Sequence, residues 1–154
     1  MIPQTLLFLT FLVLVYCSWY DWKTKKIKLS SLLIVYNIGI LYMFLSNINI
    51  VNTLSSMLVI GMIFLIPCIY SFGAGDFLLL IGLCLFFPSK QQLDLFLAVF
   101  LLVGTIYLIA YYKWFTHSRK QFLKEKFPFI PAIMITFLVF LLKVQPFAIS
   151  CYFL

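Results

Sequence analysis

The acidic side chains of this chain are few, and two of them stand beside long apolar segments. Asp21 follows an apolar run from about Gln4 to Tyr20, and Asp76 follows Gly73-Ala74-Gly75 and precedes another apolar run. A carboxylate at the edge of a hydrocarbon layer is costly, which makes it a candidate functional group. Two carboxylates within hydrogen-bond range share one proton, so one can activate water while the other polarises a peptide carbonyl. Asp21 and Asp76 are therefore the candidate catalytic pair, and this chemistry needs no metal or cofactor.

Gly73 and Gly75 are expected to support this chemistry. Glycine allows backbone conformations closed to other residues and leaves room for a peptide chain to approach closely, so both are predicted to bind substrate. Asp76 is expected near the N-terminus of a helix, where the helix dipole favours a carboxylate. The structural alternative stays open from spacing alone: Asp21 as a helix-end residue in a solvated loop, and Asp76 as a helix N-cap.

The composition predicts a membrane protein. Hydrophobic residues make up 65% of the 154 residues and charged residues 10%, whereas soluble domains average about 25% charged residues. The apolar runs are continuous rather than alternating, which favours an all-α polytopic protein of about six transmembrane helices over a barrel. Residues 1–154 are expected to form a single domain. The expected spans are about 4–20, 29–46, 52–72, 77–87, 93–112 and 128–144.

Charge placement predicts the orientation. The net charge of +7 comes largely from two basic clusters, at 23–28 and 113–126. Basic clusters beside spans are typical of cytoplasmic loops and attract anionic lipid, so membrane lipids rather than nucleic acid are the expected partners. Placing both clusters in the cytoplasm puts Asp21 and Asp76 at the same cytoplasmic face of the cell membrane and Asp94 at the opposite face. The lysines after Asp21 are expected either to lower the pKa of its carboxyl group or to bind a phospholipid headgroup.

At these residues the chain resembles the type IV prepilin peptidases, a family of polytopic aspartic proteases. Residues 21–27, DWKTKKI, are similar to the family's first motif, an Asp followed six residues later by Ile. Gly73-Ala74-Gly75-Asp76 is similar to its G-x-G-D motif, and Pro128-Phe129-Ile130-Pro131-Ala132 to a P-F-x-P stretch that opens a late helix. The chain departs from the family at Lys28, Leu29 and Leu78, where Pro, Asn and Lys are usual. Both carboxylates are present.

The resemblance implies an endopeptidase that removes a short basic leader from prepilin-like membrane proteins on the cytoplasmic side, with Asp21 and Asp76 as the catalytic residues and Gly73 and Gly75 accommodating the substrate backbone. Larger family members carry a methyltransferase domain with paired C-x-x-C motifs. The cysteines at 17, 68, 84 and 151 form no such pair, so neither a zinc site nor methylation is expected. In size the chain is similar to the minimal peptidases of tight-adherence pilus and preflagellin systems.

Two other functions are compatible with the sequence. Tyr20-Asp21 and Gly73–Asp76 also resemble motifs of the presenilin-type intramembrane proteases, although Pro131-Ala132-Ile133 only approaches that family's Pro-Ala-Leu. A small transporter or assembly factor without catalysis is the alternative from another class. It would use Asn37 and Lys143, for which an interhelical hydrogen bond and an interfacial ammonium are the simpler interpretations.

Overall fold

The computed structural model describes residues 2–51, 53–55, 57–58, 73–87, 89–115 and 128–151. These residues are helical with no strand among them, which confirms the all-α expectation. The elements with defined bounds are α1 (Ile2–Thr24), α2 (Leu29–Leu45), α4 (Ala74–Leu83), η1 (Cys84–Phe86), α5 (Lys90–Phe115) and α7 (Ile130–Cys151), η1 being a 3₁₀ turn that continues α4.

Among the described residues, two helices are long and apolar enough to cross a membrane, over Pro3–Thr24 and Gln91–Trp114. Shorter apolar helices cover Leu29–Leu45, Ala74–Phe86 and Ile130–Leu142. The expected span at about 52–72 falls mostly outside the described residues, and so does most of the second basic cluster. The count of about six spans and the multi-pass membrane setting therefore stay predictions.

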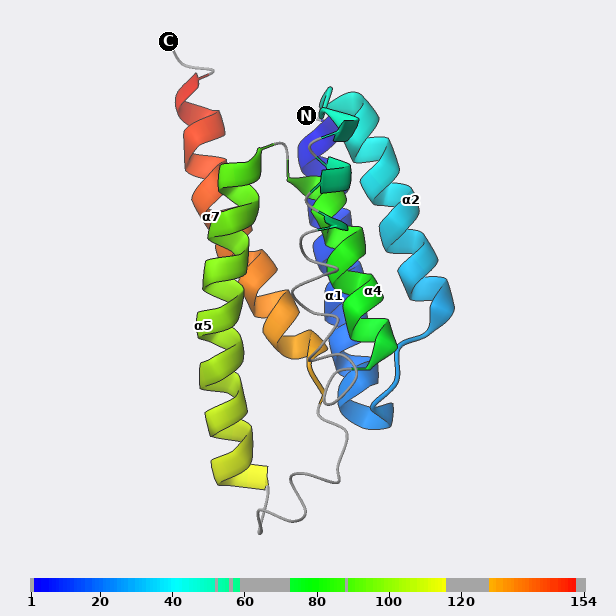
Figure 1. Cartoon of the computed structure of the whole chain (residues 1–154), viewed down its shortest axis with the longest axis vertical. Coiled ribbons are helices and arrows are strands. Elements are labelled where there is room, and N and C mark those ends of the chain that lie inside the picture. The colour runs from blue at the N-terminus through cyan, green and yellow to red at the C-terminus, as the bar shows by residue number, and fades with distance from the viewer. Residues whose placement is uncertain are drawn as a thin grey trace.

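The helices lie side by side in one elongated bundle (Figure 1). α1 packs against α2 and α7, α5 packs against α7, and α2 packs against α4 and η1. α1 ends at the lower end of the bundle as drawn, and α2, α4 and α7 all begin there (Figure 1). The ends of α1, α4 and α7 that carry the candidate motifs are consequently neighbours.

Both aspartates lie in line with the buried faces of their helices. In α1 the buried positions Leu7, Leu14 and Cys17 recur at helical spacing and lead to Asp21, which is only 4% exposed. In α4 the buried leucines at 79, 80 and 83 follow Asp76, which is 6% exposed. Residues three, four and seven apart share one face of a helix, so burial of these apolar stripes carries both carboxyl groups into the bundle.

Close contacts between α2 and α4–η1 set the position of α4. A Cβ added to Gly39 would lie 2.8 Å from Leu85 Cδ1 and 2.9 Å from Leu85 Cβ, so only glycine allows this approach. The Tyr36 hydroxyl donates a hydrogen bond of 2.9 Å to the Leu78 carbonyl oxygen. Small residues at the interface and interhelical hydrogen bonds of this kind stabilise the packing of apolar helices when the hydrophobic effect contributes little.

Several helix boundaries differ from those of the expected spans; α7, for example, continues to Cys151 rather than to 144. α1 continues past Asp21 to Thr24, and α4 begins at Ala74, before Asp76 rather than after it. The expected spans were bounded by the two carboxylates because each followed a continuous apolar run of the sequence. Both aspartates instead lie inside helices, since each faces the bundle and accepts a backbone hydrogen bond there.

Candidate functional site

Asp21 is held at the N-terminus of α7. The Ile130 N–H donates a hydrogen bond of 3.3 Å to Asp21 Oδ2, and the Phe129 N–H also bonds this carboxylate. The first N–H groups of a helix have no partner within the helix and carry the positive end of its dipole. They form a suitable site for a negative charge, and the charge of Lys25 acts on the same carboxylate.

The chain turns sharply just after Asp21. Lys25 has a φ of 53°, in the left-handed region that is usually occupied by Gly or Asn at the end of a helix. Its N–H donates a hydrogen bond of 2.7 Å to the Asp21 carbonyl oxygen, which closes the last turn of α1. The Lys25 ammonium donates to the Tyr111 hydroxyl on α5 at 3.2 Å. The turn directs Ile27 back toward α4.

Asp76 lies in the first turn of α4. Its Oδ2 accepts a hydrogen bond of 3.2 Å from the Gly73 N–H, while the Asp76 N–H donates to the Gly73 carbonyl oxygen at 3.0 Å. This reciprocal pair satisfies two backbone groups at the start of the helix, as a capping box does. The N-cap residue is therefore Gly73 and not Asp76, which is the third residue of the helix, and the Asp76 carboxyl group is buried.

Contacts between the turns that carry Asp21 and Asp76 bring the two carboxyl groups together. A Cβ added to Gly75 would lie 3.0 Å from Ile27 Cδ1 and 3.2 Å from Ile27 Cβ, so the turn after Asp21 packs directly on the G-x-G-D segment. The carboxyl groups are close enough for the charge of Asp21 to act on Asp76. Both aspartates thus lie at one end of the bundle, and the assignment of that end to the cytoplasm stays a prediction.

The two glycines behave differently from expectation. Gly73 has φ −71° and ψ 143°, ordinary extended values, and no described glycine has a positive φ. The conformational freedom that glycine allows is therefore not used at these two positions in the structure. The absence of a side chain does matter at Gly75, but the space it leaves is filled by Ile27. Gly73 is exposed, and substrate binding by either glycine stays a prediction.

α5 contributes tyrosines that the sequence analysis missed. The Tyr107 hydroxyl oxygen is buried, and the charge of Asp21 acts on it. Tyr111 accepts the Lys25 hydrogen bond, and its ring meets Trp22 edge-on at 6.2 Å. The available signal was the four-residue spacing of Tyr107 and Tyr111, which places both on one face of a helix. Nothing in the sequence indicated that this face lies near Asp21.

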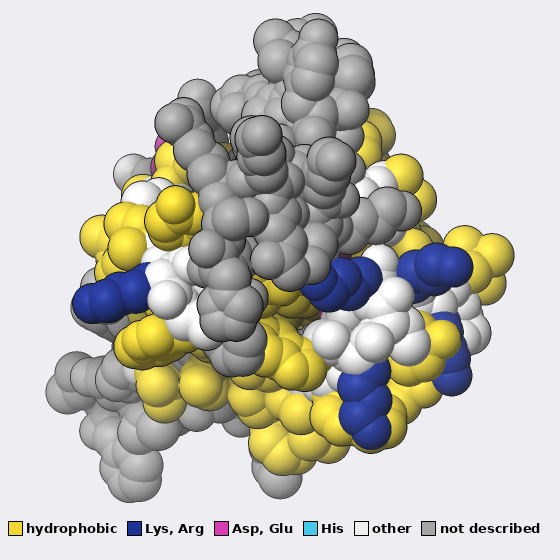
Figure 2. Space-filling view, turned by 90° about the horizontal axis from the view of Figure 1, so that it is seen from below, with side chains coloured by type: hydrophobic (Ala, Val, Ile, Leu, Met, Phe, Trp, Pro, Cys, Tyr) yellow, Lys and Arg dark blue, Asp and Glu magenta, His cyan; other side chains and the backbone are white. Residues whose placement is uncertain are grey.

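Lysine side chains surround this end of the bundle, as Figure 2 shows from below. Lys28 donates a hydrogen bond of 3.0 Å to the Tyr16 hydroxyl, which raises the pKa of the exposed ammonium, and lies 4.6 Å from the centre of the Tyr20 ring. Lys23 lies 4.1 Å from the centre of the Trp19 ring. Aromatic side chains of α1 thus hold these two lysines, whereas the Lys25 ammonium donates to Tyr111 on α5 and its charge acts on the Asp21 carboxylate.

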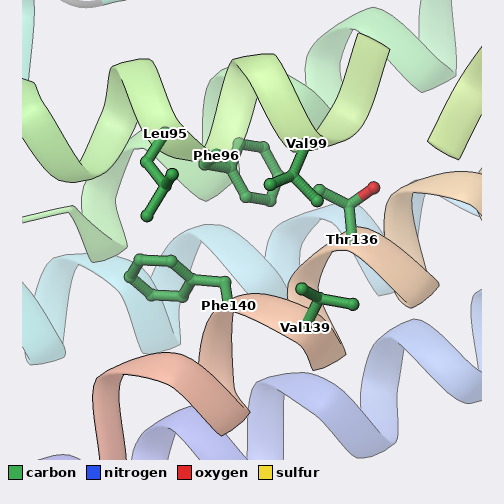
Figure 3. Close-up of a pocket in the computed structure, with 6 residues that line it drawn as sticks. All are labelled: Leu95, Phe96, Val99, Thr136, Val139 and Phe140. Carbon is green, nitrogen blue, oxygen red and sulfur yellow. The ribbon is translucent and has the colours of Figure 1, made fainter. Parts of the chain in front are cut away.

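The remaining acidic, thiol and cavity features lie away from the paired aspartates or offer them no chemistry. Asp94 is exposed near the start of α5, which begins at the opposite end of the bundle (Figure 1). Within the described ranges no three His, Cys, Asp or Glu side chains are grouped to hold a metal, and Cys17 and Cys84 are buried free thiols. A small hollow between α5 and α7 is lined by apolar side chains and Thr136 (Figure 3). The Thr136 hydroxyl bonds within its own helix, to the Ala132 carbonyl oxygen at 2.8 Å.

Comparison with known proteins gives one match. The model of the type IV leader peptidase family matches residues 8–109, which include Asp21, the segment 73–76 and Tyr107. No curated protein and no solved structure matches the chain. The matched range covers most of the chain and both candidate catalytic residues.

Proposed function

The chain belongs to the type IV leader peptidase family, and from that premise we propose that it is an aspartic endopeptidase, embedded in the cell membrane, that removes the short basic leader of prepilin-like proteins at the cytoplasmic face. One observation carries this proposal. Asp21 and Asp76, from different helices, are both buried at the same end of the bundle and act electrostatically on each other. Burying two carboxyl groups near each other lowers folding stability, so their retention favours a functional role, and paired carboxyl groups carry out catalysis in aspartic proteases.

The surroundings of the two aspartates suggest their roles. Backbone N–H groups at the start of α7 and the charge of Lys25 face Asp21, and these groups favour a carboxylate. Asp76 has one N–H partner, that of Gly73, and it faces the negative charge of Asp21. We assign the ionised state to Asp21 and the protonated state to Asp76, because one proton shared between them removes their repulsion.

The reaction then follows as general acid–base catalysis. Asp21 takes a proton from a water molecule, whose oxygen attacks the carbonyl carbon of the scissile peptide while Asp76 gives its proton to the carbonyl oxygen. The C–N bond breaks when the leaving nitrogen takes the proton held by Asp21 and the hydroxyl proton returns to Asp76. Both aspartates recover their starting states, and no covalent intermediate forms on the protein.

The helices and charges fit a substrate that enters from the membrane. α1 and α5 are long enough to span, and the lysines near the aspartates mark a cytoplasmic end under the basic-loop rule. A prepilin-like substrate has its cut at the start of an apolar helix. That helix would lie in the bilayer beside the bundle and present the leader junction at the level of Asp21 and Asp76. Because the substrate helix already lies in the bilayer, it reaches the two aspartates by diffusion in two dimensions.

The proposal is tested by co-expressing this protein with a prepilin-like substrate from the same genome. Mass spectrometry of the substrate then measures removal of its leader. Asp21→Asn and Asp76→Asn are each expected to lower the cleavage rate by about 100- to 10,000-fold, the usual contribution of a general acid or base. Asp94→Asn is the matched control, since it removes an exposed carboxylate from the far end, and it should cleave normally. Cleavage that survives either of the first two changes, in protein that inserts normally, would refute the paired-aspartate mechanism.

A further inference from the structure

Asn37 lies at the centre of the outward face of α2. It is the middle residue of this 17-residue apolar helix, and its side chain is exposed. The residues about one turn away on either side are apolar and exposed as well, Leu33 at 55% and Ile40 at 43%. The opposite face of α2 packs against α1, α4 and η1, and α2 forms one edge of the bundle (Figure 1). An amide group therefore stands in the middle of an exposed apolar surface.

The Asn37 side chain has hydrogen-bonding groups that its own helix does not use. Its Nδ2 donates a hydrogen bond of 2.7 Å to the Leu33 carbonyl oxygen within α2. This bond uses one of the two N–H groups and neither lone pair of the amide oxygen. At the α-helical rise Asn37 is about 12 Å from either end of α2, so in the proposed membrane setting it lies deep in the hydrocarbon, where no water offers a partner. An interhelical hydrogen bond to Asn37 must then come from outside the described helices.

The spacing along this face is typical of two helices that pack along each other. Exposed side chains recur at alternating steps of three and four residues, at Ser30, Leu33, Asn37, Ile40 and Phe44. This is the a/d repeat of paired helices, in which a single Asn fixes the register because its amide must meet a polar partner. Asn side chains also stabilise helix pairs in membranes, through hydrogen bonds between the helices.

We propose that this face of α2 is the interface between two copies of the chain, which pair side by side in the membrane with their Asn37 amides in contact. The amide group is self-complementary, so each copy donates its second N–H to the amide oxygen of the other. Copies inserted in one membrane share one orientation, so a two-fold axis along the membrane normal brings both amides to the same depth. This inference rests on the proposed membrane setting and not on the roles of Asp21 and Asp76.

A second copy meets the needs of the amide better than the other occupants of this face. Lipid tails carry neither a donor nor an acceptor. Residues 59–67 fall mostly outside the described ranges, and their side chains contain no N–H or O–H group, so that segment offers the amide oxygen no donor. α5 forms the opposite edge of the bundle (Figure 1). Pairing through α2 therefore leaves the α5 edge open to lipid and to a substrate helix.

The test is sedimentation equilibrium of the purified full-length protein in density-matched detergent micelles, at several ratios of protein to detergent. Wild type is expected to dimerise. Asn37→Leu removes the amide and keeps the helix apolar, so it should insert normally and raise the dimer dissociation constant about tenfold or more, the effect of one or two interhelical hydrogen bonds. Ile40→Ala should also weaken the dimer. Ile106→Ala is its matched control, because Ile106 is 60% exposed on α5, and it should dimerise like wild type.

The outcomes separate this inference from the proposed function. A wild type that stays monomeric at the highest ratio of protein to detergent overturns the inference, and so does an Asn37→Leu variant that dimerises as well as wild type. If such a variant instead has a raised KM for the membrane-embedded substrate, or a lowered thermal stability, the occupant of this face is the substrate helix or another segment of the same chain. Equal weakening by Ile40→Ala and Ile106→Ala also refutes an interface on α2. Leader cleavage is measured on the same preparations, and a dimer that does not cleave contradicts the proposed function alone.

Discussion

Replacement of Gly75 by alanine tests whether packing of the two motif turns sets the geometry of the aspartates. The added Cβ would lie 3.0 Å from Ile27 Cδ1, 3.2 Å from Ile27 Cβ and 3.3 Å from Ile27 Cγ1. Ordinary carbon contacts lie at about 3.5–4.0 Å, so the turn that carries Ile27 must retreat by about half an ångström. Ile27 Cβ is fixed to the backbone, so a change of rotamer alone does not relieve the contact.

The change is expected to lower activity as well as stability. Overpacking costs about 1–3 kcal/mol, and alanine returns up to about 1 kcal/mol through its helix propensity, so the net loss of folding free energy is at most about 3 kcal/mol. Asp21 lies at the start of the displaced turn. A misplacement of about 1 Å in a catalytic group can cost about 100-fold, so we expect Gly75→Ala to lower kcat about 10- to 100-fold.

The assay is leader cleavage under saturating substrate, with thermal inactivation measured on the same preparations. Gly104→Ala is the matched control, because its added Cβ makes only an ordinary contact of 3.4 Å with Phe129. Ile27→Ala removes Cγ1 and Cδ1, so it should recover part of the activity lost in Gly75→Ala. A Gly75→Ala variant with wild-type kcat, or a double variant that shows no coupling between the two sites, would refute the reasoning.

The remaining predictions concern helix packing and topology. Gly39→Ala should lower the free energy of unfolding by about 1–3 kcal/mol, since the new Cβ would lie 2.8 Å from Leu85 Cδ1, whereas Gly104→Ala should leave it unchanged or raise it by up to about 1 kcal/mol. Equal effects of the two changes on urea or thermal unfolding would contradict the α2–η1 packing. Thr24→Cys and Ala74→Cys should both react with a membrane-impermeant thiol reagent from the cytoplasmic side only, and labelling of the two positions from opposite sides would contradict a shared catalytic face.

Much of the architecture was predictable because its signals are local. Continuous apolar runs predict helices, because a backbone in the apolar core of a bilayer must form its hydrogen bonds within its own segment. Polar breaks placed the ends of α2 within a residue or two of those observed. The end of α1 and the start of α4 differ from the expected spans, because those spans were bounded by the two carboxylates. Whether it does so depends on the partners it finds inside the bundle, and those come from other helices.

The sequence by itself determined the helical class, the three motif segments, and the pairing of Asp21 with Asp76 at one end of the bundle. The helical class follows from continuous apolar runs, and the shared end of the two aspartates follows from the basic clusters and the number of crossings between them. The motif segments follow from the resemblance to the family. Only the tertiary structure decided that Ile27 fills the space beside Gly75 and that the α7 N-terminus binds Asp21. It also decided that the charge of Asp21 acts on the Tyr107 hydroxyl. Each of these contacts joins residues far apart in the chain. The distance between the residues in each contact is set by how closely the helices pack, and it cannot be predicted from the local sequence around either residue.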